Sequence, residues 1–318
     1  MVSAAEFDVL VIGAGVAGLT TAIRFAEARF SVCVLADRPP LATTSASAGA
    51  SWGPYLVRDD RVPHWSEQTR LTLEKIAEHP LSGVHLARGL EAARDQVEPP
   101  LWVRGVGDFE LCRPDELPDG YVCGWRYTVP LVDMPRYLDY LTRRLTVAGG
   151  QLAEGRIGSF AEVAGSARVL VNCTGLGSRT LVPDEQMYPT RGQLVVVDNP
   201  GIDSFFQDTG ERGDLTYFLP HGDRVVLGGC ALPGAESLEP DADSTRAILA
   251  RCAAIEPRLA GATVREVRVG LRPSRARVRV EWGRCAGTPV LHNYGHGGAG
   301  ITLSWGCADE VFSLSGLQ

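Results

Sequence analysis

The sequence predicts an α/β fold with a doubly wound parallel sheet, joined to a second α+β domain built on a mixed or antiparallel sheet. Three observations support this. Residues 7–37 read as strand, glycine-rich turn, helix and strand; further strands cluster between residues 191 and 281; and a strand, a glycine-rich turn and a helix follow again after residue 289.

The N-terminal unit combines two apolar strands with a helix. Phe7–Ile12 is a nearly continuous apolar run, which is typical of a parallel strand covered on both faces. Apolar side chains then repeat at the helical period over Val16–Arg29. Ser31–Leu35 predicts a second buried strand, which closes at Asp37.

The remaining elements suggest that the chain leaves the first domain and later re-enters it. The pattern predicts helices near 65–79, 88–94, Pro135–Val147, 243–254 and from Ile301, and strands at Arg168–Asn172, 191–198, 214–220, 224–229, 264–269, 276–281 and Pro289–His292, the last followed by a turn over Asn293–Gly300. We therefore expect a discontinuous first domain (1–52, 137–185, 262–318) and a second domain for substrate (53–136, 186–261).

Composition argues against several classes of partner. The net charge of −7 and the pI near 5.5 disfavour nucleic acid and anionic membranes. No apolar stretch approaches the roughly 18 residues that span a bilayer. The eight cysteines contain no C-x-x-C pair, so the sequence predicts neither a metal site nor a disulfide framework.

Gly13–Gly18 fits G-x-G-x-x-G directly after a strand and at the start of a helix. The first glycine allows the tight turn, the second lets backbone approach a pyrophosphate, and the third allows the helix to pack closely on the strand. Asp37 lies at the end of the second strand, where a carboxylate can bind a ribose diol. The unit therefore predicts a bound dinucleotide rather than a plain turn.

Two further segments favour FAD over NAD. Arg38 is followed by the small residues of Thr43–Ser51, which could let backbone approach a second part of the cofactor. Gly295–Gly300 opens another helix and could receive a phosphate or the edge of a flavin ring. A nicotinamide enzyme needs no such C-terminal glycine cluster.

Several segments together resemble the D-amino-acid oxidase family, which includes D-aspartate oxidases. They follow the family's order over nearly the whole chain: Val11–Leu19, Ala36–Arg38, Trp52 with Pro54–Tyr55, Val171–Gly175, Arg191–Gln193, Tyr217 with Pro220, Val269–Pro273 and His292–Gly298. The resemblance implies noncovalent FAD and oxidation of a D-amino acid by hydride transfer from Cα to flavin N5. The products would be a 2-oxo acid and ammonia, with dioxygen reduced to hydrogen peroxide.

The resemblance also assigns cofactor contacts by motif. These are Gly13, Ala14, Gly15, Val16, Ala17, Gly18, Asp37, Arg38, Thr43, Thr44, Ser47, Ala48, Gly49, Ile157, Thr174, Arg272, Gly297, Gly298, Ala299, Gly300, Ile301 and Thr302.

Three residues are expected to act on the substrate. Arg272 would hold the α-carboxylate, because the planar guanidinium can bind both oxygens. The Tyr217 hydroxyl would donate to the same carboxylate, and the Gly298 carbonyl would accept from the amine. Arg275, Arg277 and Arg279 are expected to be surface arginines, and His292 and His296 to be structural or next to the cofactor.

The sequence departs from the family pattern in two places. Vertebrate-type members carry a lid tyrosine where Gly213 stands here, so we expect a more open site. D-aspartate oxidases carry an arginine where Ala231 stands, which favours a neutral or apolar D-amino acid. Arg212 lies close enough in sequence to Tyr217 to substitute for that arginine, so acidic substrates stay open.

Other readings also stay open: an oxidase of glycine or sarcosine on the same fold, an NAD-dependent dehydrogenase, or a noncatalytic flavin-binding protein. The N-terminus lacks the basic segment of a signal peptide, and Leu314–Gln318 is not a peroxisomal tripeptide. With the arginine and alanine bias, this leads us to expect a bacterial, cytoplasmic enzyme. A monomer and a homodimer fit the sequence equally well.

Overall fold

The structure, a computed structural model, describes residues 6–55, 57–209 and 214–318. Its strands are β1 (Phe7–Ile12), β2 (Val32–Ala36), β3 (Val84–Ala93), β4 (Glu110–Leu111), β5 (Cys123–Val132), β6 (Gln151–Glu154), β7 (Ala167–Asn172), β8 (Tyr188–Asp198), β9 (Phe205–Asp208), β10 (Asp214–His221), β11 (Arg224–Cys230), β12 (Leu232–Pro233), β13 (Val264–Cys285) and β14 (Thr288–His296). Its helices are α1 (Val16–Glu27), α2 (Val62–Ala77), α3 (Met134–Val147), α4 (Ser178–Leu181), α5 (Ala242–Ile255) and α6 (Gly300–Ser315).

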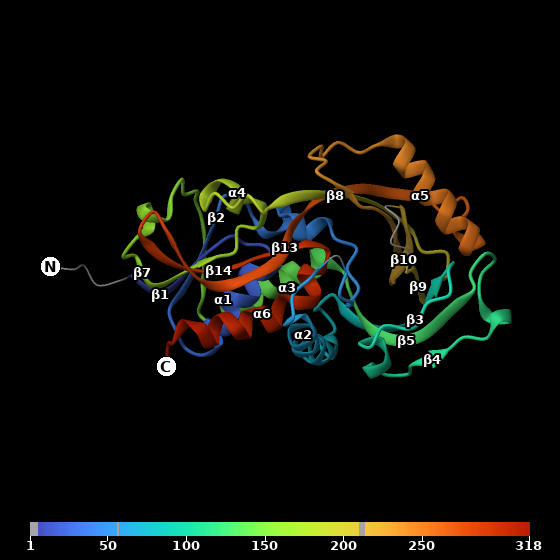
Figure 1. The fold of residues 1–318 in the computed structure, drawn as a ribbon, viewed down its shortest axis with the longest axis horizontal. Coiled ribbons are helices and arrows are strands. Elements are labelled where there is room, and N and C mark those ends of the chain that lie inside the picture. The colour runs from blue at the N-terminus through green and yellow to red at the C-terminus, as the bar shows by residue number, and fades with distance from the viewer. Residues whose placement is uncertain (1–5, 56, 210–213) are drawn as a thin grey trace.

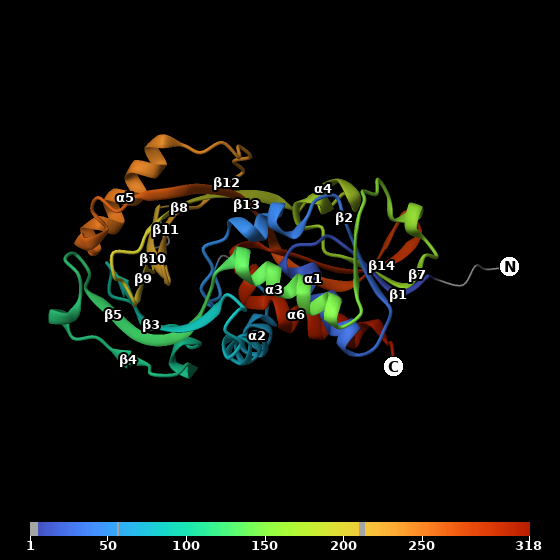
Figure 2. The same cartoon turned by 180° about the vertical axis from the view of Figure 1, so that it is seen from behind.

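The parallel part of the sheet runs in the order β14-β7-β1-β2-β6. Its central strand β1 is apolar because it is covered on both faces, and Val9 and Val11 are fully buried. Helix α1 connects β1 to β2 and packs against α3 and α6, which lie beside it in Figure 2. This arrangement confirms the predicted α/β fold class, with the glycine-rich turn at the carboxyl end of β1.

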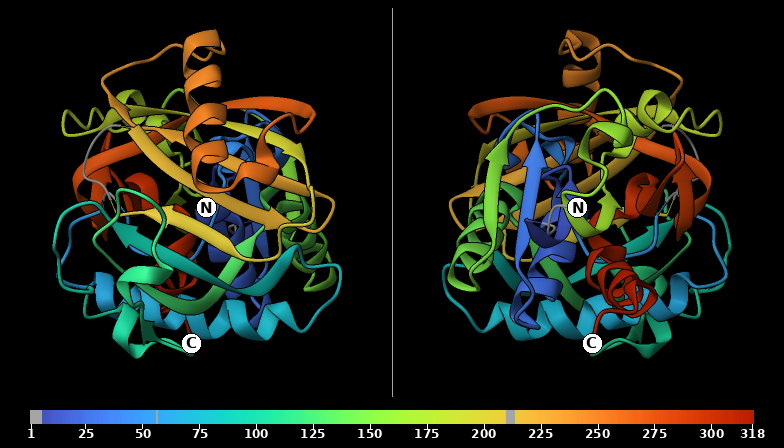
Figure 3. Two further views of the ribbon diagram at one scale, coloured as in Figure 1. Left: turned by 90° about the vertical axis from the view of Figure 1, so that its right-hand side faces the viewer. Right: turned by 90° about the vertical axis from the view of Figure 1, so that its left-hand side faces the viewer.

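The second part of the sheet is mostly antiparallel, in the order β4-β5-β3-β9-β10-β11-β8. Helix α5 packs against β8, β10 and β11, at the end of the molecule far from both chain termini (Figure 1). Figure 3 shows the molecule from each of its two ends. Of the strands predicted here, 191–198, 214–220 and 224–229 are confirmed as β8, β10 and β11. The domain boundaries given above stay a prediction.

A single long strand, β13, joins the two parts. Its first half, Val264–Ser274, pairs with β8, and its second half, as far as Cys285, pairs with β14. The register shifts between Ser274 and Arg279, which is where the strand passes from one partner to the other. Figure 1 shows β13 passing between the two parts of the sheet. Arg272 lies on this strand just before the crossing.

Three sequence predictions about local structure are wrong. The segment predicted as a helix at 88–94 is not helical: residues 88–93 belong to strand β3, because ten register pairs with β5 outweigh the helix propensity of Leu, Ala, Arg and Glu. The strands predicted at 264–269 and 276–281 are one strand. The turn expected from Asn293 begins only after His296, since β14 continues through Gly295, which has a φ of +85°.

Within the described parts of the chain, none of the helices has both the length and the apolar character that crossing a bilayer requires.

Candidate functional site

One cavity of about 1720 Å³ runs from the glycine-rich turn after β1 to the crossing point of β13. It is larger than the roughly 300–1,000 Å³ of a typical small-molecule pocket. Its walls come from both parts of the sheet, with Gly13 and Asp37 at one end and Tyr217 and Arg272 at the other. The cavity can therefore hold a long ligand together with a second, smaller molecule.

The glycine-rich turn is shaped by close backbone contacts. Gly13 has a φ of +109°, and a Cβ there would lie 2.5 Å from the Cys173 carbonyl oxygen. A Cβ on Gly18 would overlap the Gly13 carbonyl oxygen. The turn thus brings the start of α1 against β1 and β7 and leaves its outer face open to the cavity, as binding of a pyrophosphate requires.

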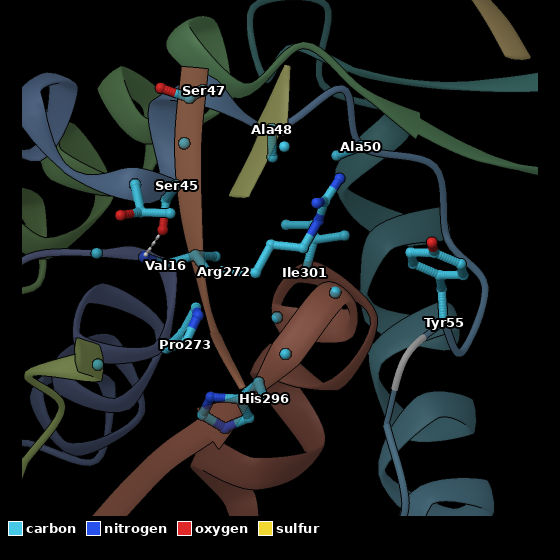
Figure 4. Close-up of a pocket in the computed structure, with 18 of the residues that line it drawn as sticks. Val16, Ser45, Ser47, Ala48, Ala50, Tyr55, Arg272, Pro273, His296 and Ile301 are labelled. Atoms are coloured by element: carbon cyan, nitrogen blue, oxygen red, sulfur yellow. Dashed lines mark hydrogen bonds between the residues drawn. The ribbon is translucent and has the colours of Figure 1, made fainter. Parts of the chain in front are cut away.

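Ser45 completes this end of the cavity. Its Oγ accepts a hydrogen bond from the Val16 amide at 3.0 Å, and a Cβ on Gly15 would lie 3.1 Å from it. Sequence reasoning placed Ser45 in a segment of small residues but gave it no role. The sequence shows only that Ser45 is one of several hydroxyl-bearing residues in a segment of small residues. It does not show that this segment folds back onto the start of α1, as Figure 4 does.

Most of the predicted cofactor contacts line the cavity. They are Gly13, Ala14, Gly15, Val16, Ala17, Asp37, Arg38, Thr43, Thr44, Ser47, Ala48, Gly49, Ile157, Thr174, Arg272, Gly297, Gly298, Gly300 and Ile301. Asp37 and Arg38 are paired with each other at the cavity rim, with exposed side chains. The structure thus brings together segments that are nearly 300 residues apart.

Three predicted contacts are not among the lining residues. Gly18 packs against the turn, and Ala299 is fully buried. The Thr302 hydroxyl binds the backbone of Gly53, accepting from its N–H at 3.1 Å and donating to its carbonyl at 2.9 Å. It therefore ties the 51–55 loop to α6.

At the other end, the Arg272 side chain lies against Gly192 of the neighbouring strand. A Cβ on Gly192 would come within 2.6 Å of the Arg272 Cζ, so only glycine leaves room for the guanidinium. One guanidinium N–H donates to the Cys230 carbonyl at 3.0 Å. The group is thus held in place while it lines the cavity.

The neighbouring arginines on β13 differ from one another. Arg277 is exposed, as expected. Arg275 and Arg279 are largely buried, and both bind Asp184, at 3.0 and 3.5 Å. The expectation that they lie free on the surface is wrong for these two, because the crossing of β13 carries them over a buried carboxylate.

Tyr217 lies beside Gly228, its cross-strand partner on β11. A Cβ at Gly228 would overlap the tyrosine ring. The backbone of Gly49 also lies close to the Tyr217 hydroxyl. Burial raises the pKa of Tyr217 to about 12, against a lowering influence of Arg272. The phenol is therefore protonated at neutral pH and can donate a hydrogen bond.

Tyr55 is a second tyrosine at this end, and sequence reasoning gave it no role. Its ring lies over Gly298, where a Cβ would come within 2.6 Å of the Tyr55 Cδ1. Burial raises the pKa of the Tyr55 hydroxyl, which the charge of Arg272 opposes. Figure 4 shows Tyr55, Arg272 and Ile301 around the same space.

His292 and His296, which both lie on β14, are buried. His292 approaches Asn172 at 3.4 Å, and the His296 Nε2 lies 3.0 Å from the Asn293 Oδ1. Burial lowers the pKa of each to about 4. Among the described residues, no group of three histidine, cysteine or acidic side chains could hold a metal ion. Gly213 and Arg212 lie outside the described residues.

A family model described as FAD dependent oxidoreductase matches residues 8–314. The chain belongs to this family. It is 46% identical over 310 residues to a D-amino-acid oxidase of Rubrobacter xylanophilus, which covers 96% of this chain and 95% of that protein. It is 36% identical over 322 residues to a human D-aspartate oxidase, covering 96% and 94%.

Among solved structures, the glycine oxidase of Geobacillus kaustophilus has the same fold. The TM-score is 0.82 over 97% of this chain and 94% of that chain, at 18% sequence identity. The protein is thus an FAD-dependent oxidoreductase, and FAD is its cofactor. The observed cavity fits FAD. At one end lies the glycine-rich turn, where Gly13 and Gly18 have no room for a Cβ, and from there the cavity continues to Arg272.

Proposed function

We propose that the protein is a D-amino-acid oxidase, which converts a D-amino acid, dioxygen and water into a 2-oxo acid, ammonia and hydrogen peroxide. The observation that carries this proposal is the guanidinium of Arg272 at the end of the cavity opposite the glycine-rich turn, where Tyr55 and Tyr217 line the same cavity and both feel the charge of Arg272. The relatives named D-amino-acid oxidase, 46% and 41% identical over nearly the whole chain, support it.

Arg272 and Tyr217 bind the α-carboxylate in this proposal. The guanidinium can form two parallel charge-assisted hydrogen bonds with the two carboxylate oxygens, and the protonated Tyr217 can donate a third. Because the Cys230 carbonyl and Gly192 fix the guanidinium, little conformational entropy is lost when the substrate binds. Only a substrate with a free carboxylate uses this arrangement fully.

The amine is oriented on the opposite side of the site. The backbone of Gly298 lies under the Tyr55 ring, and its carbonyl is assigned as the acceptor for the substrate amine. FAD, when bound, supplies the two-electron oxidation of the Cα–N bond. The protein's part is positioning and exclusion of water, and no side-chain base is assigned.

The side chain of the substrate points to the rest of the cavity. Ala231 in place of an arginine continues to favour neutral over acidic substrates. D-aspartate oxidase is the alternative activity, and glycine or sarcosine oxidation is a further one on the same fold. A cytoplasmic location and a monomeric or homodimeric state also stay predictions.

A substrate panel tests the proposal. The purified protein should show a flavin spectrum and release hydrogen peroxide in air with D-alanine, D-leucine and D-methionine, but not with their L-enantiomers. A higher kcat/KM for D-aspartate, glycine or sarcosine than for every neutral chiral D-amino acid would favour one of the alternatives. No peroxide from any D-amino acid would overturn the proposal.

A further inference from the structure

A row of four side chains, beginning with Tyr217, crosses the wall of the cavity. Tyr217 on β10 pairs with Gln207 on β9, Gln207 with Glu91 on β3, and Glu91 with Trp125 on β5. Directly paired residues project from the same face of a sheet, and all four line the cavity. Glu91 is two strands from Tyr217, which corresponds to about 10 Å at the usual strand spacing.

Glu91 is a buried carboxyl group in this wall. Only 7% of the residue is exposed. Its Oε2 accepts hydrogen bonds from the Tyr127 hydroxyl at 2.5 Å and the Trp125 indole at 3.3 Å. The Gln207 amide also donates to it, at 3.4 Å. Every hydrogen bond recorded on the carboxyl among the described residues is thus on one oxygen, and Oε1 has none.

This asymmetry indicates an acceptor that is kept available. Oε1 is not one of the fully buried polar atoms that lack a partner among the described residues, so it is open to the cavity, where water or a ligand can donate to it. A purely structural network around Tyr127, Trp125 and Gln207 would need only the one oxygen that they share. Burial raises the pKa of Glu91, so a cation next to Oε1 would stabilise the ionised form.

We propose that Glu91 is a specificity-determining residue whose Oε1 accepts a hydrogen bond from the end of a long D-amino-acid side chain, foremost an ammonium or guanidinium group. This rests on the proposed oxidase function. It goes beyond the neutral or apolar side chain expected from the sequence, because it adds a charged partner at the far end of the pocket.

Two arginines also line the cavity, and each already has partners. Arg94 lies 3.6 Å from Asp208 and over the Tyr121 ring. Arg251 donates to the backbone carbonyls of Leu215 and Gly229. Neither arginine donates a hydrogen bond to Glu91, whose donors among the described residues are Tyr127, Trp125 and Gln207.

The test compares two substrates that differ only in the terminal group. D-Lysine ends in an ammonium, whereas D-norleucine has the same chain without it. With the holoenzyme at neutral pH, kcat/KM should be higher for D-lysine. In Glu91→Gln the ratio of D-lysine to D-norleucine should fall about tenfold, through loss of the charge-assisted bond, with D-norleucine little changed.

Two control variants separate specificity from structure. Gln207→Leu removes the neighbouring amide but leaves the carboxyl group, so the ratio should stay within about threefold of the parent. Glu98→Gln removes an exposed carboxylate that also lines the cavity and should leave the ratio unchanged. A ratio that falls equally in all three variants would overturn the assignment to Glu91.

The parent enzyme alone also tests the idea, even where Glu91→Gln does not fold. A kcat/KM for D-norleucine equal to or above that for D-lysine would refute the role of Glu91 while leaving the oxidase function intact. No turnover of any D-amino acid would refute the function and the role of Glu91 together.

Discussion

The two ends of the cavity use glycine in opposite ways. At the dinucleotide turn, Gly13 and Gly18 allow one backbone to approach another, and few side chains are needed. At the β13 crossing, Gly192 and Gly228 make room for the Arg272 and Tyr217 side chains of neighbouring strands. In the proposed function, the first end therefore recognises its ligand by main-chain shape, and the second by the charged and hydrogen-bonding side chains that pack against glycine.

This difference separates the effects of substitutions. Changes at the first end should affect retention of FAD, and changes at the second should affect substrate kinetics with FAD retained.

The largest effect is expected from Arg272→Leu. Loss of two charge-assisted hydrogen bonds to the α-carboxylate should lower kcat/KM for D-alanine about 1000-fold. Arg272 is also one of the predicted cofactor contacts, but the glycine-rich turn is unchanged in this variant, so the flavin content should stay close to that of the parent, as measured by the visible spectrum. Arg277→Leu is the matched control, since this arginine is on the same strand, its side chain is 61% exposed, and within the described part of the chain its one ion pair is with Asp60. If Arg272→Leu lost its flavin, the separation of the two ends would be wrong.

Gly13→Ala should have the next largest effect, at the opposite end. Its Cβ would meet the Cys173 carbonyl at 2.5 Å in a backbone conformation that favours glycine. We expect the Kd for FAD to rise about 100-fold from strain and displacement of the turn.

The control for Gly13→Ala is Gly287→Ala. Gly287 has a φ of +81° in the β13–β14 turn, with nothing within 4 Å of its Cβ position. It should lower thermal stability but leave the Kd for FAD unchanged. Equal losses of FAD affinity in the two variants would show that strain alone, not the close approach, matters at Gly13.

The sequence predicted the first end of the cavity better than the second. The turn at Gly13–Gly18 is contiguous, so its strand, glycine spacing and helix are visible in one segment. The pocket wall of Glu91, Gln207 and Tyr217 depends on register among β3, β9 and β10, which no local pattern reveals. Residues 88–93 show this most clearly, because their composition favours a helix and their pairing with β5 and β9 makes them a strand.

Acid should lower the stability of the protein through His221, which lies at the end of β10. Its ring nitrogens are buried with no hydrogen-bond partner among the described residues, and burial lowers its pKa from 6.5 to about 4. The unfolded chain therefore binds more protons between these two values. The contribution of neutral His221 to the free energy of unfolding is therefore full above about pH 6.5. It decreases as the pH falls, and the loss reaches about 2 kcal/mol at pH 5.

His221→Leu tests this contribution. It removes the titrating ring without leaving a bonded partner unpaired, so the fall in Tm between pH 7.5 and pH 5 should be smaller than in the parent. His296→Leu is the contrasting variant, because it leaves the Asn293 Oδ1 without its 3.0 Å partner and should lower Tm at both pH values. An unchanged pH dependence in His221→Leu would assign the acid sensitivity elsewhere.

The smallest effect is expected from Tyr217→Phe, which removes one hydroxyl from the substrate end. The ring still fits against Gly228, so the fold and the flavin content should not change. Loss of one hydrogen bond to a charged carboxylate should raise KM for D-alanine about tenfold with little change in kcat. Tyr188→Phe, at an exposed position on β8, should leave both constants unchanged. A fall in kcat with KM unchanged would mean that Tyr217 acts in the oxidation step itself and not in holding the carboxylate. The two ends would then differ even more than proposed, since a side chain of the substrate end would take part in the reaction as well as in binding.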